Sequence, residues 1–190
     1  MNSISASQTQ SDILERQQID ILIVDDVPDN IRFLSAFLMQ QGYQVRKAIN
    51  GKMALGSVTA LIPDLILLDV NLPDMSGYEV CEELKQNRST ASIPIIFLSA
   101  ENNAIDKVKA FQLGASDYIT KPFQLEEVLA RINTQLTIQT LQKELKEQNQ
   151  QLKETLVELK AAQANLVQQE KMATLRKVVA GVAHEINNPL

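Results

Sequence analysis

The chain has 190 residues, of which 45% are hydrophobic, and its 23 acidic and 18 basic residues give a formal net charge of −5. This length accommodates one compact domain with additional segments or two small domains, and the acidic balance gives no electrostatic basis for binding nucleic acid. The single cysteine, Cys81, excludes an intrachain disulfide framework and fits a reducing compartment.

The first 18 residues are polar and low in hydrophobicity, which is typical of a disordered tail. They contain no basic cluster followed by an apolar stretch, so we do not expect a signal peptide. The longest apolar runs of the chain are much shorter than a membrane-spanning helix. The sequence therefore predicts a cytoplasmic protein with no direct membrane span.

From Ile19 to about Gln135, short β-type runs alternate with helical patterns. Gly42 and Gly114 follow two of these patterns, at positions where glycine favours the left-handed conformation that ends a helix. Five strand–helix alternations predict an α/β fold, a doubly wound five-stranded parallel sheet with helices on both faces. The expected strands are 19–25, 43–48, 64–69, 94–99 and 117–120, and the expected helices lie near 29–41, 51–61, 77–87 and 103–113.

A different composition begins after Gln135, because 136–169 contain no glycine, proline or aromatic residue. An apolar residue recurs there every seven positions, which is the heptad pattern of a coiled coil. If these residues take position d, the a row is mostly polar, and Asn149 in that row would fix the register of a parallel dimer. The alternative is a solvated single helix, although a helix this polar is marginally stable in water. The d row is Ile138, Leu145, Leu152, Leu159 and Leu166, and the a row is Gln142, Asn149, Leu156 and Gln163.

Chemically reactive side chains stand at the carboxyl ends of the expected strands. Asp25 and Asp26 end the first strand, Asp69 the third and Ser99 the fourth, and Lys121 follows the fifth. Ligands of open parallel sheets bind at this edge, and in the common strand order 2-1-3-4-5 the first and third strands are neighbours. The three carboxylates would then converge on a hard divalent cation such as Mg²⁺. A central carboxylate can act as nucleophile on phosphorus, with the lysine and the serine holding phosphoryl oxygens.

Each of these residues also has a purely structural explanation. An aspartate after a strand often caps a helix, as Asp26 or Asp29 would for the helix entered at Pro28. A serine at a strand end is usually structural, and a lysine before proline usually lies on the surface. The joint placement of five such residues at one edge favours the functional interpretation.

Four stretches of the chain resemble a response-regulator receiver domain: "ILIVDDVPDN", "LILLDVNLPDMSGYEVCEELK", "PIIFLSA" and "GASDYITKPF". The resemblance covers about 19–135 and implies the receiver (CheY-like), flavodoxin-like fold with strand order 2-1-3-4-5. It implies that Asp69 accepts a phosphoryl group and that Lys121 binds this group. It also implies a cis peptide bond between Lys121 and Pro122.

The same resemblance implies a metal site and a conformational switch. Ser99 takes the position of the hydroxyl residue that contacts the phosphoryl group. Tyr118 takes the position of the aromatic residue that moves with this hydroxyl residue. The implied ligands of Mg²⁺ are Asp25 through water, Asp26, Asp69 and the backbone carbonyl of Asn71.

The only histidine, His184, lies in an apolar pattern of helical spacing near the end of the sequence. At about 100° per residue it stands roughly 200° from Val182, so it points away from the apolar face. A buried structural histidine would be expected on that face, which favours a phosphate-accepting histidine instead. The apolar positions are Met172, Leu175, Val179, Val182 and Ile186.

The stretch "HEINNPL" (184–190) resembles the phosphoacceptor box of sensor histidine kinases, and the preceding "EKMATLRKVVAGVA" extends this resemblance. It implies that His184 accepts phosphate from ATP, that Glu185 acts as base and that Asn188 aids the transfer. The second helix of the dimerisation domain and the ATP-binding domain of such kinases are not found in these 190 residues. We therefore expect the front of a larger hybrid sensor kinase and leave open whether this chain is an enzyme.

Together these patterns predict four segments: a tail (1–18), a receiver domain (19–135), a coiled-coil linker helix (136–170) and the start of a phosphoacceptor helix (171–190). The expected function is two-component phosphorelay signal transduction. Its expected partners are a phosphodonor histidine kinase or phosphotransfer protein and a second copy of the chain, paired in parallel through the coiled coil. The first alternative is a stand-alone response regulator, a phosphorylation-switched binding module, and the second is a passive dimeric scaffold.

Overall fold

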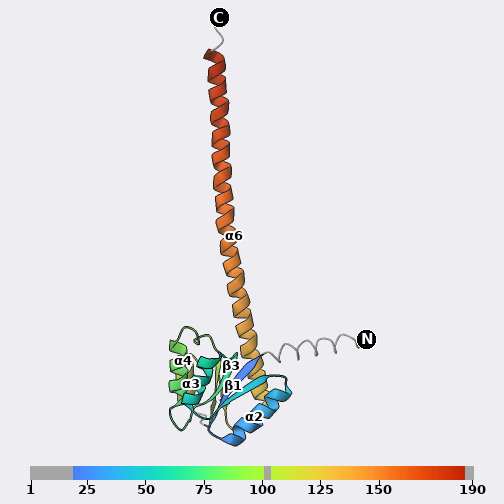
Figure 1. Cartoon of the computed structure of the whole chain (residues 1–190), viewed down its shortest axis with the longest axis vertical. Coiled ribbons are helices and arrows are strands. Elements are labelled where there is room, and N and C mark those ends of the chain that lie inside the picture. Colours follow the sequence, from blue (N-terminus) through green and yellow to red (C-terminus); the bar gives the residue numbers. More distant parts are fainter. Residues whose placement is uncertain (1–18, 101–103, 187–190) are drawn as a thin grey trace, which may run out of the picture. The chain divides into compact units, whose positions relative to one another are not determined.

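The computed structural model describes residues 19–100 and 104–186, and the tail predicted at 1–18 lies outside them. Five parallel strands form one sheet in the order β2-β1-β3-β4-β5, which confirms the predicted fold class (Figure 1). Every strand lies within one residue of its expected bounds. The strands are β1 Asp20–Val24, β2 Gln44–Ala48, β3 Leu65–Asp69, β4 Ile95–Ser99 and β5 Asp117–Thr120.

Helices cover both faces of the sheet. Leu34 of α2 and Ile132 of α6 are buried in the core on one face, together with alternate residues of the strands. Val58 of α3, Val80 of α4 and Ala110 of α5 are buried in the core on the other face. The helices are α2 Pro28–Gln40, α3 Gly51–Ala60, α4 Gly77–Gln86, α5 Ala104–Gln112 and α6 Leu125–Ile186.

The three central strands supply most of the core. All five residues of β1, β3 and β4 are buried, whereas the edge strand β2 is mostly half-buried or exposed. Successive side chains of β1 point to opposite faces, so that Ile21 and Ile23 join one core and Leu22 and Val24 the other. A strand covered on both faces needs apolar residues at every position, which explains the continuous apolar runs in the sequence.

Two glycines end helices as predicted. Gly42 and Gly114 have φ angles of 90° and 88°, a left-handed conformation that side chains with a Cβ disfavour. The N–H of Gly42 donates to the carbonyl of Met39, and that of Gly114 to the carbonyl of Phe111, both at 3.0 Å. Each glycine therefore closes the last turn of its helix and lets the chain turn towards the next strand.

The last helix, α6, is continuous from Leu125 to Ile186. The chain divides into two units between Gln139 and Thr140, and in the second unit every residue from 140 to 169 is exposed. The leucines of the d row in this stretch keep 58–63% of their surface exposed. None of the helices within the described ranges is both long and apolar enough to cross a membrane.

Gly77, the first residue of α4, lies against the backbone at the end of β3. Its N–H donates to the carbonyl oxygen of Val70 at 2.8 Å. A Cβ added to Gly77 would overlap the carbonyl oxygen of Asp69 and would lie 3.1 Å from the Cα of Val70. Backbone atoms cannot move aside as a flexible side chain can. The close approach is therefore possible because glycine has no Cβ.

Gly77→Ala should lower the free energy of unfolding by about 1–3 kcal/mol, because the added methyl group forces the backbones of α4 and β3 apart. Urea denaturation followed by circular dichroism measures this change. Gly56→Ala in α3 is the matched control, since no described atom lies within 4 Å of its added Cβ. Alanine is about 0.5–1 kcal/mol better than glycine inside a helix, so the control should gain stability. Equal stability of the two variants would contradict the close packing at Gly77.

Candidate functional site

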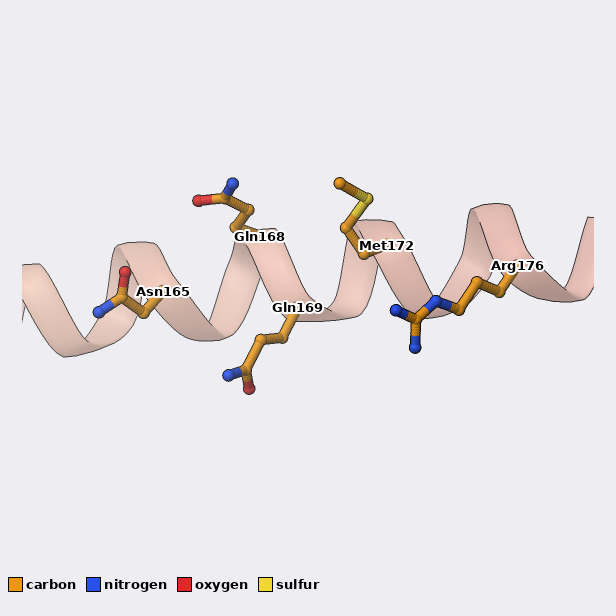
Figure 2. Close-up of a pocket in the computed structure, with 5 residues that line it drawn as sticks. All are labelled: Asn165, Gln168, Gln169, Met172 and Arg176. Carbon is orange, nitrogen blue, oxygen red and sulfur yellow. The ribbon is translucent and has the colours of Figure 1, made fainter.

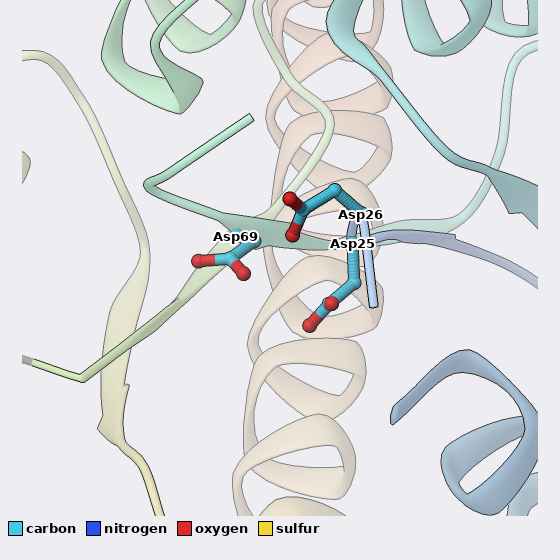
Figure 3. Close-up of side chains that lie close together, drawn as sticks. All are labelled: Asp25, Asp26 and Asp69. Atoms are coloured by element: carbon cyan, nitrogen blue, oxygen red, sulfur yellow. The ribbon is translucent and has the colours of Figure 1, made fainter. Parts of the chain in front are cut away.

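The acidic pocket, formed by Asp25, Asp26 and Asp69, lies at the carboxyl ends of β1 and β3. These two strands are neighbours in the sheet, and Val24 pairs with Leu68, so the residues that follow them come together. One carboxylate oxygen from each aspartate lies within 4.8 Å of those of the other two (Figure 3). The strand order thus brings together the three carboxylates that the sequence analysis expected at one edge.

Lys121 joins two of these carboxylates. Its Nζ lies 2.7 Å from Oδ2 of Asp25 and 2.5 Å from Oδ2 of Asp69. The lysine follows β5, its backbone N–H donates to the carbonyl oxygen of Ser99 at 2.6 Å, and its peptide bond to Pro122 is cis, as the resemblance implied. Lys121, which follows β5, therefore contacts the ends of β1 and β3 through its side chain and the end of β4 through its backbone.

Burial has the largest effect on the pKa of Asp69. Removal from water raises the pKa of this carboxyl. This effect outweighs the lowering of the pKa by Lys121 and by the N–H of Asn71, which lies 3.2 Å from Oδ1. For Lys121, burial alone would lower the pKa, but the hydrogen bonds to Asp25 and Asp69 and their charges outweigh it. The pKa of Lys121 is therefore raised, and its ammonium stays charged at neutral pH.

Asp25 is held by Asn30 of α2, a residue that the sequence patterns did not reveal. The Nδ2 of Asn30 donates to both carboxylate oxygens of Asp25, at 3.1 and 3.0 Å, and the N–H of Val27 donates to Oδ1 at 2.8 Å. With Lys121 on Oδ2, the fully buried Asp25 is bonded on both oxygens by the chain itself. The signal available in the sequence was an asparagine in the first turn of the expected helix. Ordinary helix starts also contain such residues, so this signal does not identify a site.

Asp26 is the exposed member of the acidic pocket, and its carboxylate makes no hydrogen bond or ion pair with any residue that the structure describes. Three acidic side chains face the single ammonium of Lys121 at this edge, so acidic groups outnumber basic ones there. Carboxylate oxygen ligands suit a hard divalent cation. The residues present therefore fit the Mg²⁺ that the resemblance implies.

The other predicted residues of this region lie near the strand ends. Ser99, the last residue of β4, is 2% exposed, and β4 runs beside β3, with Leu98 paired to Asp69. Tyr118 of β5 is buried in the core and pairs with Phe97 of β4. Asn71 is exposed and follows β3 closely.

The predicted phosphoacceptor residues near the end of the chain are described only in part. His184 and Glu185 belong to the backbone of α6, but their side chains lie outside what the structure describes. Asn188 lies outside the described residues altogether. The roles of these three residues stay predictions.

The chain is similar to signalling proteins of several kinds. It is 42% identical over 116 residues to the DNA-binding dual master transcriptional regulator RpaA of Synechocystis sp., a match that covers 61% of this chain and 48% of RpaA. The solved signal receiver domain of a signal transduction histidine kinase from Syntrophus aciditrophicus is 35% identical, with a TM-score of 0.59 and coverage of 62% of this chain and 89% of that domain.

A CheY-like response regulator receiver domain protein from Methanospirillum hungatei is 28% identical, with a TM-score of 0.62 and coverage of 65% of this chain and 98% of that protein. The chain spans about a quarter to a half of the length of the first curated relatives that it matches. Residues 21–133, more than half of the chain, match the response regulator receiver domain, and this range contains the acidic pocket and Lys121. The chain therefore belongs to the response regulator receiver domain family and contains the receiver domain of a two-component response regulator.

Proposed function

We propose that Asp69 accepts a phosphoryl group and that the acidic pocket binds Mg²⁺ for this transfer. The observation that carries the proposal is the contact of Lys121 with two carboxylates at the strand ends, at 2.7 Å from Asp25 and 2.5 Å from Asp69. Receiver domains bind Mg²⁺ at an acidic pocket, and this chain has such a cluster. A receiver domain also implies a phosphodonor partner such as a histidine kinase.

In the proposed transfer, a carboxylate oxygen of Asp69 attacks the phosphorus of the donor. A new oxygen–phosphorus bond forms, the bond between phosphorus and the donor breaks, and the leaving group takes the electron pair. The ammonium of Lys121 binds one phosphoryl oxygen, and the hydroxyl of Ser99 donates a hydrogen bond to another. Tyr118 then moves with Ser99 as the switch residue and alters the surface of the domain.

The proposed metal ligands are oxygen atoms. Asp26, Asp69 and the backbone carbonyl of Asn71 would bind Mg²⁺ directly, and Asp25 would act through water. The free carboxylate of Asp26 and the fully bonded carboxylate of Asp25 support this division of roles. When bound, the cation supplies positive charge that balances the carboxylates and the incoming phosphoryl group.

The exposed apolar row on α6 supports a parallel homodimer. Leucines repeated every seven residues and left in water are stabilised by pairing with a second helix. In three successive repeats, the leucine at position d is followed by a lysine at position e. In an antiparallel pair of helices, the e positions face one another, so these lysines would repel. In a parallel pair they would face position g, which holds no charged residue. The lysines are Lys146, Lys153 and Lys160, and position g holds Leu141, Gln148, Thr155 and Ala162.

The surface of α6 has a hollow away from this apolar row. The hollow is formed by residues of α6 alone (Figure 2). Counted from Leu166 at position d, its lining residues take positions c, f and g, so the hollow lies outside the d and a rows and the proposed pairing does not rest on it. The lining residues are Asn165, Gln168, Gln169, Met172 and Arg176.

We further propose that the paired helix carries the signal to a histidine-kinase phosphoacceptor at His184, in a cytoplasmic sensor kinase. Two observations support this proposal. "HEINNPL" resembles the phosphoacceptor box of sensor histidine kinases, and the chain is similar to the receiver domain of a signal transduction histidine kinase. The helix that contributes Val128 and Ile132 to the receiver core continues without a break to Ile186. Cys81 is buried and unpaired, which fits a reducing compartment.

The alternative is a stand-alone response regulator whose helical tail binds a partner when Asp69 is phosphorylated. The family match and the curated relatives are equally consistent with this function. The two proposals differ at His184, which receives phosphate only in the kinase.

Asp69→Asn should abolish phosphate uptake from acetyl phosphate in the presence of Mg²⁺, because the amide keeps the shape of the side chain but is not a nucleophile. Mass spectrometry of the intact chain measures the added phosphate. Asp64→Asn is the control. Asp64 lies just before β3 and accepts a hydrogen bond from the N–H of Asp20 at 2.8 Å, which the side-chain oxygen of asparagine can still accept. Uptake by Asp69→Asn at the rate of the unchanged chain would overturn the assignment of Asp69.

Replacing Leu152 and Leu159 together by lysine should convert a dimer to a monomer, because charges would enter the apolar row between the two helices. Sedimentation equilibrium measures the mass of the species in solution. Val157→Lys is the matched control, since Val157 is 68% exposed but lies outside the d and a rows. A monomeric unchanged chain, or equal dissociation in the control, would contradict the proposed pairing.

His184 should acquire phosphate when a separate, matching kinase catalytic domain and Mg-ATP are added, but not from Mg-ATP alone. A nucleophile needs its donor held close and in line, which the added domain provides. Acid-labile, base-stable phosphate that is lost in His184→Gln identifies the phosphohistidine. If the matching domain leaves His184 unlabelled, the stand-alone regulator is favoured. Labelling by ATP without the added domain would contradict the proposal of a kinase front segment.

A further inference from the structure

The loop of residues 70–76 joins β3 to α4 and carries Asn71, whose backbone carbonyl is a proposed metal ligand. At the start of the 70–76 loop, the N–H of Asn71 donates to Oδ1 of Asp69 at 3.2 Å. At its end, the N–H of Gly77 donates to the carbonyl of Val70 at 2.8 Å. These two hydrogen bonds fix the ends of the loop, so its centre needs a separate support.

Asp74 fastens the centre of the 70–76 loop to α3. Its Oδ1 accepts the N–H of Gly51 at 2.8 Å, and its Oδ2 accepts the N–H of Lys52 at 2.9 Å. These are the first two N–H groups of α3, which have no partner within the helix, and negative charge is favoured at this end. The hydrogen bonds, that of Lys52 foremost, lower the pKa of Asp74 although the side chain is exposed.

The start of α3 does not depend on Asp74 alone. Asn50 caps the helix, and its side-chain oxygen accepts the N–H of Met53 at 2.8 Å. The loop residue Met75 lies so close to Gly51 that an added Cβ would overlap its side chain. Because the helix has its own cap, the two hydrogen bonds of Asp74 chiefly fix where the loop lies.

We infer that Asp74 is a positioning residue for the acidic pocket, an inference that rests on the proposed function of that pocket. Asp74 anchors the 70–76 loop on α3. It thereby holds the carbonyl of Asn71 within reach of a cation that Asp26 and Asp69 bind. Only Leu72 and Pro73 separate Asn71 from the anchored residue. Without this anchor, the loop would have to be ordered when the cation binds, and that ordering opposes binding.

Calorimetric titration of the full chain with Mg²⁺ tests the inference. Asp74→Ala should weaken Mg²⁺ binding about tenfold, the lower end of the effect of removing a group that orients a metal ligand. Asn50→Ala is the matched control, because it removes a cap from the same end of α3 but no bond to the loop, and it should leave the affinity unchanged. Asp74→Asn keeps an acceptor oxygen and should fall between Asp74→Ala and the unchanged chain.

Amide hydrogen exchange without metal provides the second readout. Asp74→Ala should speed exchange at Asn71 and Met75, whereas Asn50→Ala should speed it at Met53 only. Unchanged exchange in the loop, or faster exchange with unchanged Mg²⁺ affinity, overturns the inference and leaves the proposed pocket standing. If Asp26→Ala binds Mg²⁺ as tightly as the unchanged chain, the proposed pocket itself is wrong, and the role of Asp74 falls with it.

Discussion

The ammonium of Lys121 between Asp25 and Asp69 is the interaction on which the site depends. The order of the parallel strands brings the ends of β1 and β3 together, so the backbone of the sheet holds the aspartates that follow them close to one another. Like charges at this range raise the free energy of the folded chain. One ammonium and the hydrogen bonds from Asn30 and Val27 offset part of this cost, and the remaining negative charge is available to bind a cation.

Burial of Asp69 links the proposed reactivity of the site to its stability. Because burial raises the pKa of Asp69 above its ordinary value of 3.8, the folded chain binds this proton more tightly than the unfolded chain does. Stability contributed by the protonated form is therefore lost as the pH rises from 3.8 through the raised value. Above the raised pKa the ionised carboxylate opposes folding, and a bound cation relieves this cost. The residue proposed as nucleophile is thus one whose charged form is disfavoured by burial.

The hydrophobic pattern was sufficient to predict the strands, and the strand order common to such sheets then predicted the edge at which the carboxylates meet. Continuous apolar runs marked β1, β3 and β4, and parallel strands share one edge for their carboxyl ends. The roles of Asn30 and Asp74 could not be predicted in this way, because their partners depend on where a helix begins relative to a loop. Asp74, for example, bonds to the start of α3, and no periodicity in the sequence relates the two. The heptad row of α6 was visible in the sequence, but the pairing proposed for it involves a second molecule.

Titration of Asp69 is the measurement that tests these electrostatics most directly. The carbon-13 shift of its carboxyl carbon, followed by NMR against pH without divalent cations, reports the protonation of this one residue. We predict a midpoint above the ordinary value of 3.8, which moves to lower pH when Mg²⁺ is added. A midpoint below 3.8 without metal would mean that the contact with Lys121 outweighs burial, and it would contradict the claim that the acidic pocket holds negative charge that the chain itself does not balance.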